Sequence, residues 1–161
     1  MTEFQSIMTL SPETVAGLLA LNNRFARETS WLSEDEWTQM LSGAFATFAA
    51  DTQGFLLAFD QDAVYDSRNF LWFRSRFERF VYIDRVVIDP AAQGQGLGRR
   101  FYEALAKVAR DAGHDRIVCE VNTVPDNPAS HRFHERLGFA AIADVEWQAG
   151  QKAVRYYEWG L

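Results

Sequence analysis

Residues 86–100 have the sequence VVIDPAAQGQGLGRR, in which Gly94, Gly96 and Gly98 alternate with other residues between an apolar run and a helical pattern. Glycine leaves the main chain bare, so backbone N–H groups there can approach an anion closely. The N-terminus of the helix that follows adds about half a positive charge, and the two arginines that end the stretch add full charges. The stretch therefore predicts a cradle for a phosphate or pyrophosphate.

The glycine spacing separates this cradle from two other phosphate-binding loops. No Gly-Lys-Ser or Gly-Lys-Thr follows, so the stretch is not a nucleotide P-loop. The glycines fall at i, i+2 and i+4, which is not the G-x-G-x-x-G spacing of dinucleotide-binding folds. A tight turn without a ligand is the simpler alternative, but three glycines and paired arginines are more than a turn requires.

The flanking residues place the cradle inside a βαβ unit. Residues 80–88 are almost continuously apolar, as in a strand buried on both faces. Residues 96–112 carry apolar side chains on one face at helical spacing. Residues 116–121 (RIVCEV) are the next strand. Together these elements predict a mixed α/β (α+β) sheet with a central βαβ unit.

The rest of the chain supplies further elements of the same sheet. Ser11-Pro12 and the capping box over 33–36 are helix starts, for helices that end near Asn22 and Gly43. Residues 61–79 fit neither the strand period nor the helix period. Further strands are expected over 4–9, 44–50, 55–60, 139–147 and 152–159, and a short helix over 128–137 between the cap Asn127 and Gly138.

Length and composition limit the classes of protein that this chain can represent. Its 161 residues, 48% hydrophobic and 24% charged, are expected to form a single domain over 1–161. The net charge of −6 disfavours nonspecific binding to nucleic acid or to an anionic membrane. One cysteine, Cys119, excludes an internal disulfide and a thiol-based zinc site. With no signal peptide or apolar span, we expect a soluble cytoplasmic protein without a metal.

Two motifs carry a resemblance to a known family. The first is Gln93-Gly94-Gln95-Gly96-Leu97-Gly98, which fits the pattern [Gln/Arg]-x-x-Gly-x-[Gly/Ala]. The second, about 30 residues further on, is Asn127, a short helix carrying Ala129 and Ser130, and a Gly-Phe end at 138–139. In this order the motifs resemble the GCN5-related N-acetyltransferase (GNAT) superfamily. The resemblance implies a mostly antiparallel sheet of about six or seven strands with about four helices, in which strands 80–88 and 116–121 part.

The resemblance also implies acetyl-CoA as the acyl donor and assigns residues to it. The backbone of Val86, Val87 and Ile88 would pair with the pantetheine amides as an added strand does. Asn127, Ser130 and Phe133 would lie beside the pantetheine and its thiol end. The pyrophosphate would be held by the backbone amides of Gln93, Gly94, Gln95, Gly96, Leu97, Gly98 and Arg99.

Acetyl transfer to an amine requires an uncharged amine and benefits from a proton returned to the thiolate. Glu120, near the end of its strand, is one candidate base, and an ion-paired sheet carboxylate is the alternative. Asp84 is a second candidate, which either pairs with Arg85 or faces the acceptor. His134 occupies the position where the family commonly has a tyrosine acid, and imidazole can also donate a proton. Alternatively, His134 binds the cofactor or only packs. His131 is expected at the surface or beside the phosphate.

Acceptor specificity, by the same resemblance, would come from residues 22–33 and 61–79. The aromatic side chains of the second segment could line a pocket for a small amine, and its arginines could bind a carboxylate, although packing against the sheet is the favoured explanation for most of the aromatic residues. We expect direct attack by a small-molecule primary amine, without nucleic-acid or membrane partners. A noncatalytic acyl-CoA sensor, a protein N-terminal acetyltransferase and a homodimer all stay open.

Overall fold

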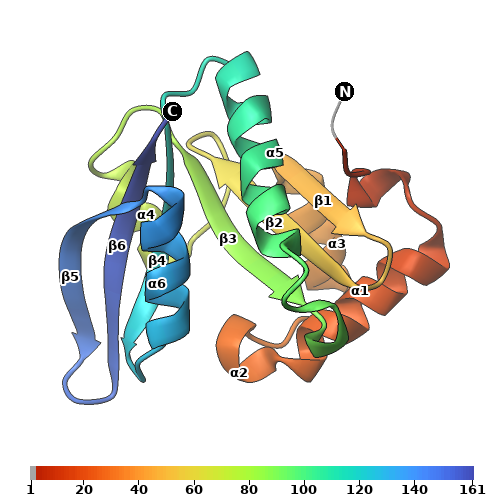
Figure 1. Ribbon diagram of the computed structural model, residues 1–161, viewed down its shortest axis with the longest axis horizontal. Helices are drawn as coiled ribbons and strands as arrows, with labels where there is room; N and C mark the ends of the chain where they lie inside the picture. Colours follow the sequence, from red (N-terminus) through yellow and green to blue (C-terminus); the bar gives the residue numbers. More distant parts are fainter. Residues whose placement is uncertain (1–2) are drawn as a thin grey trace.

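A computed structural model describes residues 3–161, which form a six-stranded sheet in the order β1-β2-β3-β4-β6-β5 (Figure 1). Every neighbouring pair is antiparallel except β3 and β4, which are parallel. This is the mixed, mostly antiparallel sheet that the sequence predicts. The strands are β1 (Ala46–Ala50), β2 (Gly54–Asp60), β3 (Val81–Ile88), β4 (Arg116–Val124), β5 (Ala140–Gln148) and β6 (Lys152–Gly160).

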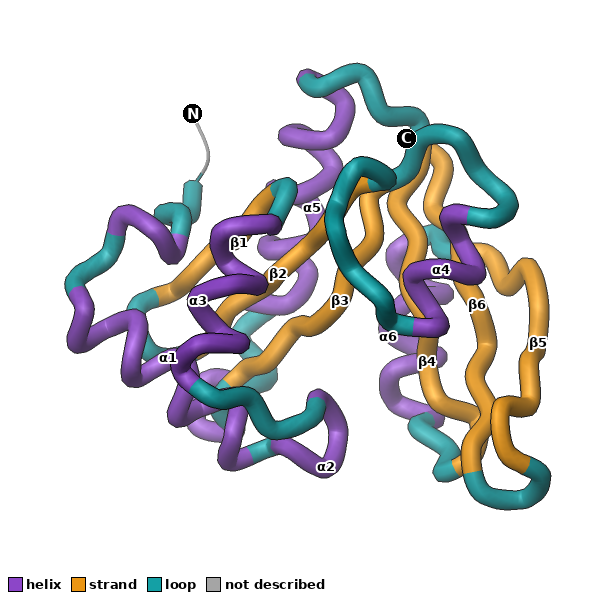
Figure 2. The backbone as a smooth tube through the Cα atoms, turned by 180° about the vertical axis from the view of Figure 1, so that it is seen from behind, coloured by secondary structure: helices purple, strands orange, loops and turns teal. Residues whose placement is uncertain are grey.

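Helices cover both faces of the sheet, and each face has its own apolar core. Helices α5 and α6 lie on one face, and α1, α3 and α4 lie on the other (Figures 1 and 2). The α-helices of residues 3–161 are α1 (Pro12–Arg24), α2 (Ala26–Thr29), α3 (Glu34–Gly43), α4 (Arg68–Arg74), α5 (Leu97–Asp111) and α6 (Pro128–Leu137). The resemblance predicts about four helices. The two additional helices are α2, which is a single turn, and the seven-residue α4.

The helix boundaries follow the capping signals of the sequence. The Ser11 side chain accepts a hydrogen bond from the N–H of Thr14 at the start of α1. Ser33 and Glu36 form the predicted capping box of α3, with both reciprocal hydrogen bonds present. Asn127 caps α6, and Gly138 ends it in the left-handed conformation at φ 111°. Local polar chemistry therefore sets where these helices begin and end.

Strands β3 and β4 pair only briefly and then part. Their register contains two pairs, Val81 with Ile117 and Tyr82 with Val118. Beyond Tyr82, β3 keeps its hydrogen bonds to β2, while β4 keeps its own to β6. The parting predicted for these two strands is therefore confirmed, and the edge of β3 from Ile83 onward has no partner strand on the β4 side.

One segment prediction is wrong, and a segment without a predicted element contains a helix. Residues 4–9 form a 3₁₀ helix over Ile7–Thr9 with a single bridge between Gln5 and Ala49, and not a strand. The Ile7 N–H donates to the Thr47 hydroxyl at 3.0 Å, so the backbone turns away from the edge of the sheet. Residues 61–79 contain α4, whose Phe70 and Phe73 are fully buried. Aromatic side chains on several sides of this short helix hide its period in the sequence.

Within residues 3–161, no helix is both long enough and apolar enough to cross a bilayer. The same residues contain no cluster of three His, Cys, Asp or Glu side chains that could ligate a metal ion.

Candidate active site

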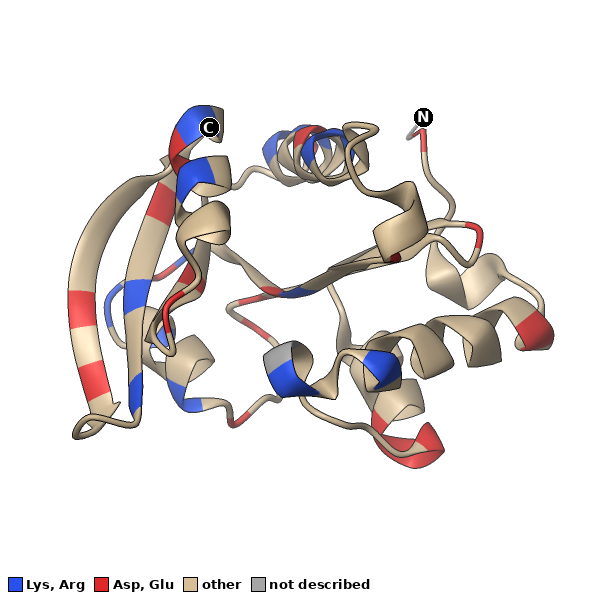
Figure 3. Ribbon diagram, turned by 60° about the horizontal axis from the view of Figure 1, so that its bottom comes forward, with Lys and Arg blue, Asp and Glu red and all other residues tan. Residues whose placement is uncertain are grey.

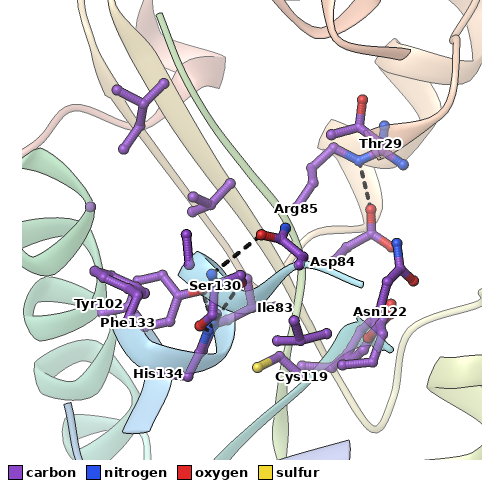
Figure 4. Close-up of a pocket in the computed structure, with 18 of the residues that line it drawn as sticks. Thr29, Ile83, Asp84, Arg85, Tyr102, Cys119, Asn122, Ser130, Phe133 and His134 are labelled. Atoms are coloured by element: carbon purple, nitrogen blue, oxygen red, sulfur yellow. Dashed lines mark hydrogen bonds and ion pairs between the residues drawn. The ribbon is translucent and has the colours of Figure 1, made fainter. Parts of the chain in front are cut away.

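A cleft of about 770 Å³ lies where β3 and β4 part. Its lining combines residues of β3 and β4 with the N-terminal ends of α5 and α6 and with the segments that contain α2 and α4. Figure 4 shows Tyr102, Ser130 and His134 on one side of the cleft, and Thr29 and Arg85 on the other, with Asp84 next to Arg85. The cleft therefore joins the predicted cradle to the predicted catalytic residues.

The glycine cradle forms one end of the cleft and has the conformation that its residues predict. Gly94 and Gly96 have φ angles of 80° and 77°, and a Cβ on either would meet nothing within 4 Å. The space in front of these two glycines is therefore open. Within residues 3–161, the N–H groups from Gly96 to Arg99 have no acceptor, as expected for the first turn of a helix. Open space and free donors at a helix N-terminus fit a pyrophosphate.

Gly98 and the two arginines have different environments. A Cβ on Gly98 would lie 3.3 Å from Ile88 Cδ1 and 3.4 Å from Phe133 Cζ, so this glycine allows α5 to pack closely. Arg99 lines the cleft. Arg100 does not line it, because its guanidinium is ion-paired with Glu3 and lies over the ring of Phe4. The interpretation that both arginines charge the cradle is therefore wrong for Arg100.

Glu120, at the other end of the cleft, is held by neutral hydrogen-bond donors. The Tyr82 hydroxyl lies 2.9 Å from both carboxylate oxygens, and Asn69 Nδ2 donates to Oε1 at 3.1 Å. Burial and the nearby charge of Asp84 raise the pKa of Glu120 to about 7, although both hydrogen bonds oppose this shift. A carboxyl group with this pKa can gain and lose a proton near neutral pH.

The amide of Asn69 has only one orientation that satisfies its neighbours. Its Oδ1 accepts hydrogen bonds from Trp147 Nε1 at 3.1 Å and from the Tyr156 hydroxyl at 2.8 Å. Both neighbours donate, so the NH₂ group must face Glu120. Helix α4 and the C-terminal strands therefore position Glu120 through one side chain.

Asp84 is paired, in contrast to Glu120. Arg85 Nε donates to one carboxylate oxygen at 2.7 Å, and the Tyr65 hydroxyl donates to the other at 2.5 Å. The Asp84 and Arg85 side chains are each 5% exposed, and Arg85 Nη1 also donates to Asn22 Oδ1 at 3.0 Å. Asp84 is therefore ion-paired with Arg85, and it also lines the cleft.

His134 lies in the cleft with both ring nitrogens engaged. Nδ1 lies 2.7 Å from the Ser130 carbonyl oxygen, which can only accept, so Nδ1 carries the hydrogen. Nε2 then accepts from the Tyr102 hydroxyl at 2.8 Å. Burial lowers the pKa of His134, which favours this neutral form. Tyr102, which sequence reasoning missed, is the hydroxyl-bearing partner of this histidine.

His131 and Cys119 are both buried. The prediction that His131 lies at the surface is wrong, because its Nδ1 lies 2.6 Å from the Tyr157 hydroxyl and its Nε2 lies 3.0 Å from the Asn122 carbonyl oxygen. It therefore links α6 to the end of β4.

Burial raises the pKa of the Cys119 thiol, which keeps it protonated and disfavours a role as nucleophile.

Residues 18–139 match the family model of the acetyltransferase (GNAT) family.

The chain belongs to the GNAT acetyltransferase family.

Curated members of this family and solved structures resemble the chain in different ways. Over 93 residues it is 36% identical to the L-amino acid N-acyltransferase MnaT of Escherichia coli, covering 58% of this chain and 49% of that protein. Over 145 residues it is 33% identical to a mycothiol acetyltransferase of Mycobacteroides abscessus, covering 86% of this chain and 46% of that protein. The chain thus spans about half the length of these relatives. Arabidopsis thaliana NAA60 in complex with acetyl-CoA shares the fold, with a TM-score of 0.73, 14% identity and 98% coverage of both chains.

Sequence reasoning did not single out three further residues that line this cleft, namely Tyr82, Asn69 and Tyr65. Tyr82 precedes Asp84 by two positions on one strand, so strand alternation places both on the same face. No comparable signal marks Asn69 or Tyr65, because they come from a segment without a clear period.

We predict that Asn69→Asp raises the pKa of Glu120 above about 7. The variant removes a donor and places a second carboxylate next to the first, and both changes favour the protonated form. A shift of about one unit or more is expected, measured by NMR titration of ¹³C-carboxyl-labelled protein. Gln39→Glu makes the same chemical change on the exposed surface of α3 and should leave the titration in place; an unshifted Glu120 in Asn69→Asp would contradict this assignment.

Proposed function

We propose that this chain is an acetyl-CoA-dependent N-acetyltransferase that acts on a small-molecule primary amine by direct attack. The observation that carries the proposal is that one cleft has the bare backbone of Gly94 and Gly96 at one end and the Glu120 carboxyl group, with a pKa of about 7, at the other. The first feature suits the diphosphate of coenzyme A, and the second suits removal of a proton from the attacking amine.

The residues that would hold acetyl-CoA are those of the cradle and of the open edge of β3. The free N–H groups of the first turn of α5 would bind the pyrophosphate, together with the backbone from Gln93 through Gly94 and Gln95. The edge at Val86, Val87 and Ile88 has backbone groups available to the pantetheine amides. Asn127, Ser130 and Phe133 would flank the thiol end, since all three line the cleft beside His134 and Asn127 also caps α6. The bound thioester supplies the acetyl group.

Glu120 is the proposed base. An ammonium has no lone pair, so the amine must lose a proton before it attacks, directly to the carboxylate or through a water. At neutral pH a carboxyl group of pKa about 7 is partly ionised and basic enough to accept that proton. Asp84 is the weaker candidate as base because Arg85 and Tyr65 already occupy its oxygens; its proposed role is to stabilise charge beside the acceptor amine.

The Tyr102–His134 pair contains the proposed acid. Nδ1–H of His134 is held by the Ser130 carbonyl, so Nε2 carries no proton and accepts the hydrogen bond of the Tyr102 hydroxyl. A proton that reaches the departing sulfur therefore leaves from the Tyr102 hydroxyl, which is then reprotonated from water, while the unprotonated Nε2 of His134 holds that hydroxyl in place. The proposed acid is therefore Tyr102 and not His134, which would only position the hydroxyl.

The proposed acceptor is an amine that also carries a carboxylate, such as an amino acid. Arg85 and Lys152 line the cleft beside the two acidic side chains, and Lys152 Nζ lies 2.7 Å from Asn122 Oδ1. Opposite charges placed together in this way suit a zwitterion. The similarity to an L-amino acid N-acyltransferase supports the same acceptor class.

Mass spectrometry with acetyl-CoA and a panel of amino acids, simple amines and N-terminal peptides tests the proposal. We expect acetylation of amino acids and little or none of peptides. Binding of acetyl-CoA without turnover on any amine would favour a sensor, and turnover on peptides alone would favour N-terminal acetylation.

Glu120→Gln should lower kcat/KM by about 100-fold or more at neutral pH because the amide cannot accept a proton. In the wild-type protein, kcat/KM should rise with pH through about 7 as Glu120 ionises, and the variant should lose this limb. Glu146→Gln, on the exposed surface of β5, is the control and should behave like wild type. A wild-type pH profile in Glu120→Gln would remove Glu120 as the base.

Tyr102→Phe should lower kcat by about 10- to 100-fold while the Kd for acetyl-CoA changes less than about twofold, because only the proton donor is lost. Stopped-flow turnover and calorimetry measure the two quantities. An unchanged kcat would show that the thiolate leaves without help from this hydroxyl.

A further inference from the structure

Lys152, the first residue of β6, lies at the Glu120 end of the cleft. It lines the cleft together with Glu120 and Asn122, which are two positions apart on β4 and therefore point to the same face of that strand. Its Nζ donates to Asn122 Oδ1 at 2.7 Å, which uses one of the three hydrogens of the ammonium group. The ammonium group therefore has further donors for a ligand in the cleft.

The charge of Lys152 is not neutralised by the chain. Among the described residues, no carboxylate lies within ion-pair distance of this side chain. By contrast, the two arginines that line the cleft each have a carboxylate partner, Asp84 for Arg85 and Glu103 for Arg99. The cleft thus has one uncompensated full positive charge, and it lies beside the proposed base.

The register of the β5–β6 hairpin leaves Lys152 without an acidic neighbour on β5. Figure 3 shows basic residues along β6 beside acidic residues of β5. Arg155 lies opposite Asp144 and binds it at 2.7 Å, whereas Lys152 lies opposite the uncharged Gln148. The acidic residues of the hairpin therefore do not occupy this lysine.

The start of β6 is held by irregular pairing on both sides. The registers of β4 and β5 both shift at Ala153, the residue that follows Lys152. Bulges of this kind redirect nearby side chains and are common beside active sites. The extra residue of β5 is Trp147, whose Nε1 donates to Asn69 Oδ1 at 3.1 Å and ties the hairpin to α4. Lys152 therefore enters the cleft from a fixed hairpin.

Lys152 and Glu120 influence each other without direct contact. Partial burial lowers the pKa of Lys152, and the charge of Glu120 opposes this shift. Within the part of the chain that the structure describes, no hydrogen bond or ion pair joins the two side chains, although both line one cleft. A small zwitterion fits this arrangement, with its amine toward the carboxylate and its carboxylate toward the ammonium group.

We infer that Lys152 recognises the carboxylate of the acceptor and thereby determines acceptor specificity, an inference that rests on the proposed function. Arg85 is the other cation at this end of the cleft, but its guanidinium already donates to Asp84 and Asn22. Lys152 has no such competing carboxylate.

This assignment places a specificity determinant in the C-terminal hairpin, outside residues 22–33 and 61–79. An acceptor without a carboxylate would leave the half-buried charge of Lys152 without a partner, which costs binding free energy. The protein therefore discriminates an amino acid from its carboxamide, although both carry the same reacting amine.

Steady-state kinetics with L-methionine, L-leucine and L-phenylalanine, each compared with its carboxamide, test the inference. For the wild-type protein, kcat/KM should be about 10- to 100-fold higher for the amino acids, as expected for one or two charge-assisted contacts. Lys152→Met removes the charge and should reduce this ratio to less than about threefold. Lys152→Glu should reverse it in favour of the carboxamides. A change in the ratio between two proteins does not depend on the different basicity of the two amines.

Two further variants serve as controls. Lys152→Arg keeps the positive charge and should keep most of the preference. Lys107→Met makes the same chemical change as Lys152→Met on the exposed surface of α5 and should leave the ratio at its wild-type value. Calorimetry should give a Kd for acetyl-CoA within about twofold of wild type for every variant, which shows that the variants are folded.

The possible failures are distinguishable. A wild-type ratio in Lys152→Met would overturn the inference and leave the proposed function standing. An equal loss for amino acids and carboxamides would also overturn it, because Lys152 would then act only on the charge of Glu120. A wild-type protein without any preference would contradict the inference and the amino-acid acceptor, but not acetyl transfer. Absence of turnover on every amine would contradict the proposed function as well.

Discussion

The short parallel pairing between β3 and β4 is the constraint on which the site depends. Two residue pairs join the strands, and beyond them each strand is held only on its outer side. Buried backbone groups without partners cost free energy, so an edge of this kind is stable only where water or a bound chain can reach it. The helices α5 and α6 cover the same face and bring their N-terminal ends to the opening (Figure 1). A cleft, a free strand edge and a helix N-terminus with free donors therefore arise from one departure from regular sheet pairing.

The two carboxylates of the cleft illustrate how surroundings separate like groups. Asp84 has a guanidinium and a phenol on its oxygens, whereas Glu120 has a phenol and an amide, which carry no full charge. Asp84 in turn raises the pKa of Glu120, so the ion-paired residue helps to set the proton affinity of the other. Pairs whose environments drive their proton affinities apart are a common way to divide acid–base tasks.

Features that depend on neighbouring residues were predictable from sequence, and features that depend on distant ones were not. The cradle, its strand and helix, and the caps at Ser11, Ser33 and Asn127 are local patterns, and the structure has them. The strand over 4–9 was wrong because the Thr47 hydroxyl, about forty positions away, takes the Ile7 N–H. The hydrogen bond between Asn69 and Tyr156 joins residues 87 positions apart, and no spacing rule connects them. The cleft positions of Glu120 and His134 were therefore readable from local patterns, but the side chains that contact them were not.

The position of Asn69 links two properties that are usually treated separately. Helix α4 belongs to the 61–79 segment, which borders the Glu120 end of the cleft through Tyr65 and Ser67, and the same helix carries the amide that donates to Glu120. Remodelling this segment to admit a different amine would also shift the pKa of Glu120, the proposed base. Substrate range and optimal pH would then change together when this region diverges, and engineering one of them without the other requires leaving the contacts of Asn69 with Trp147, Tyr156 and Glu120 intact.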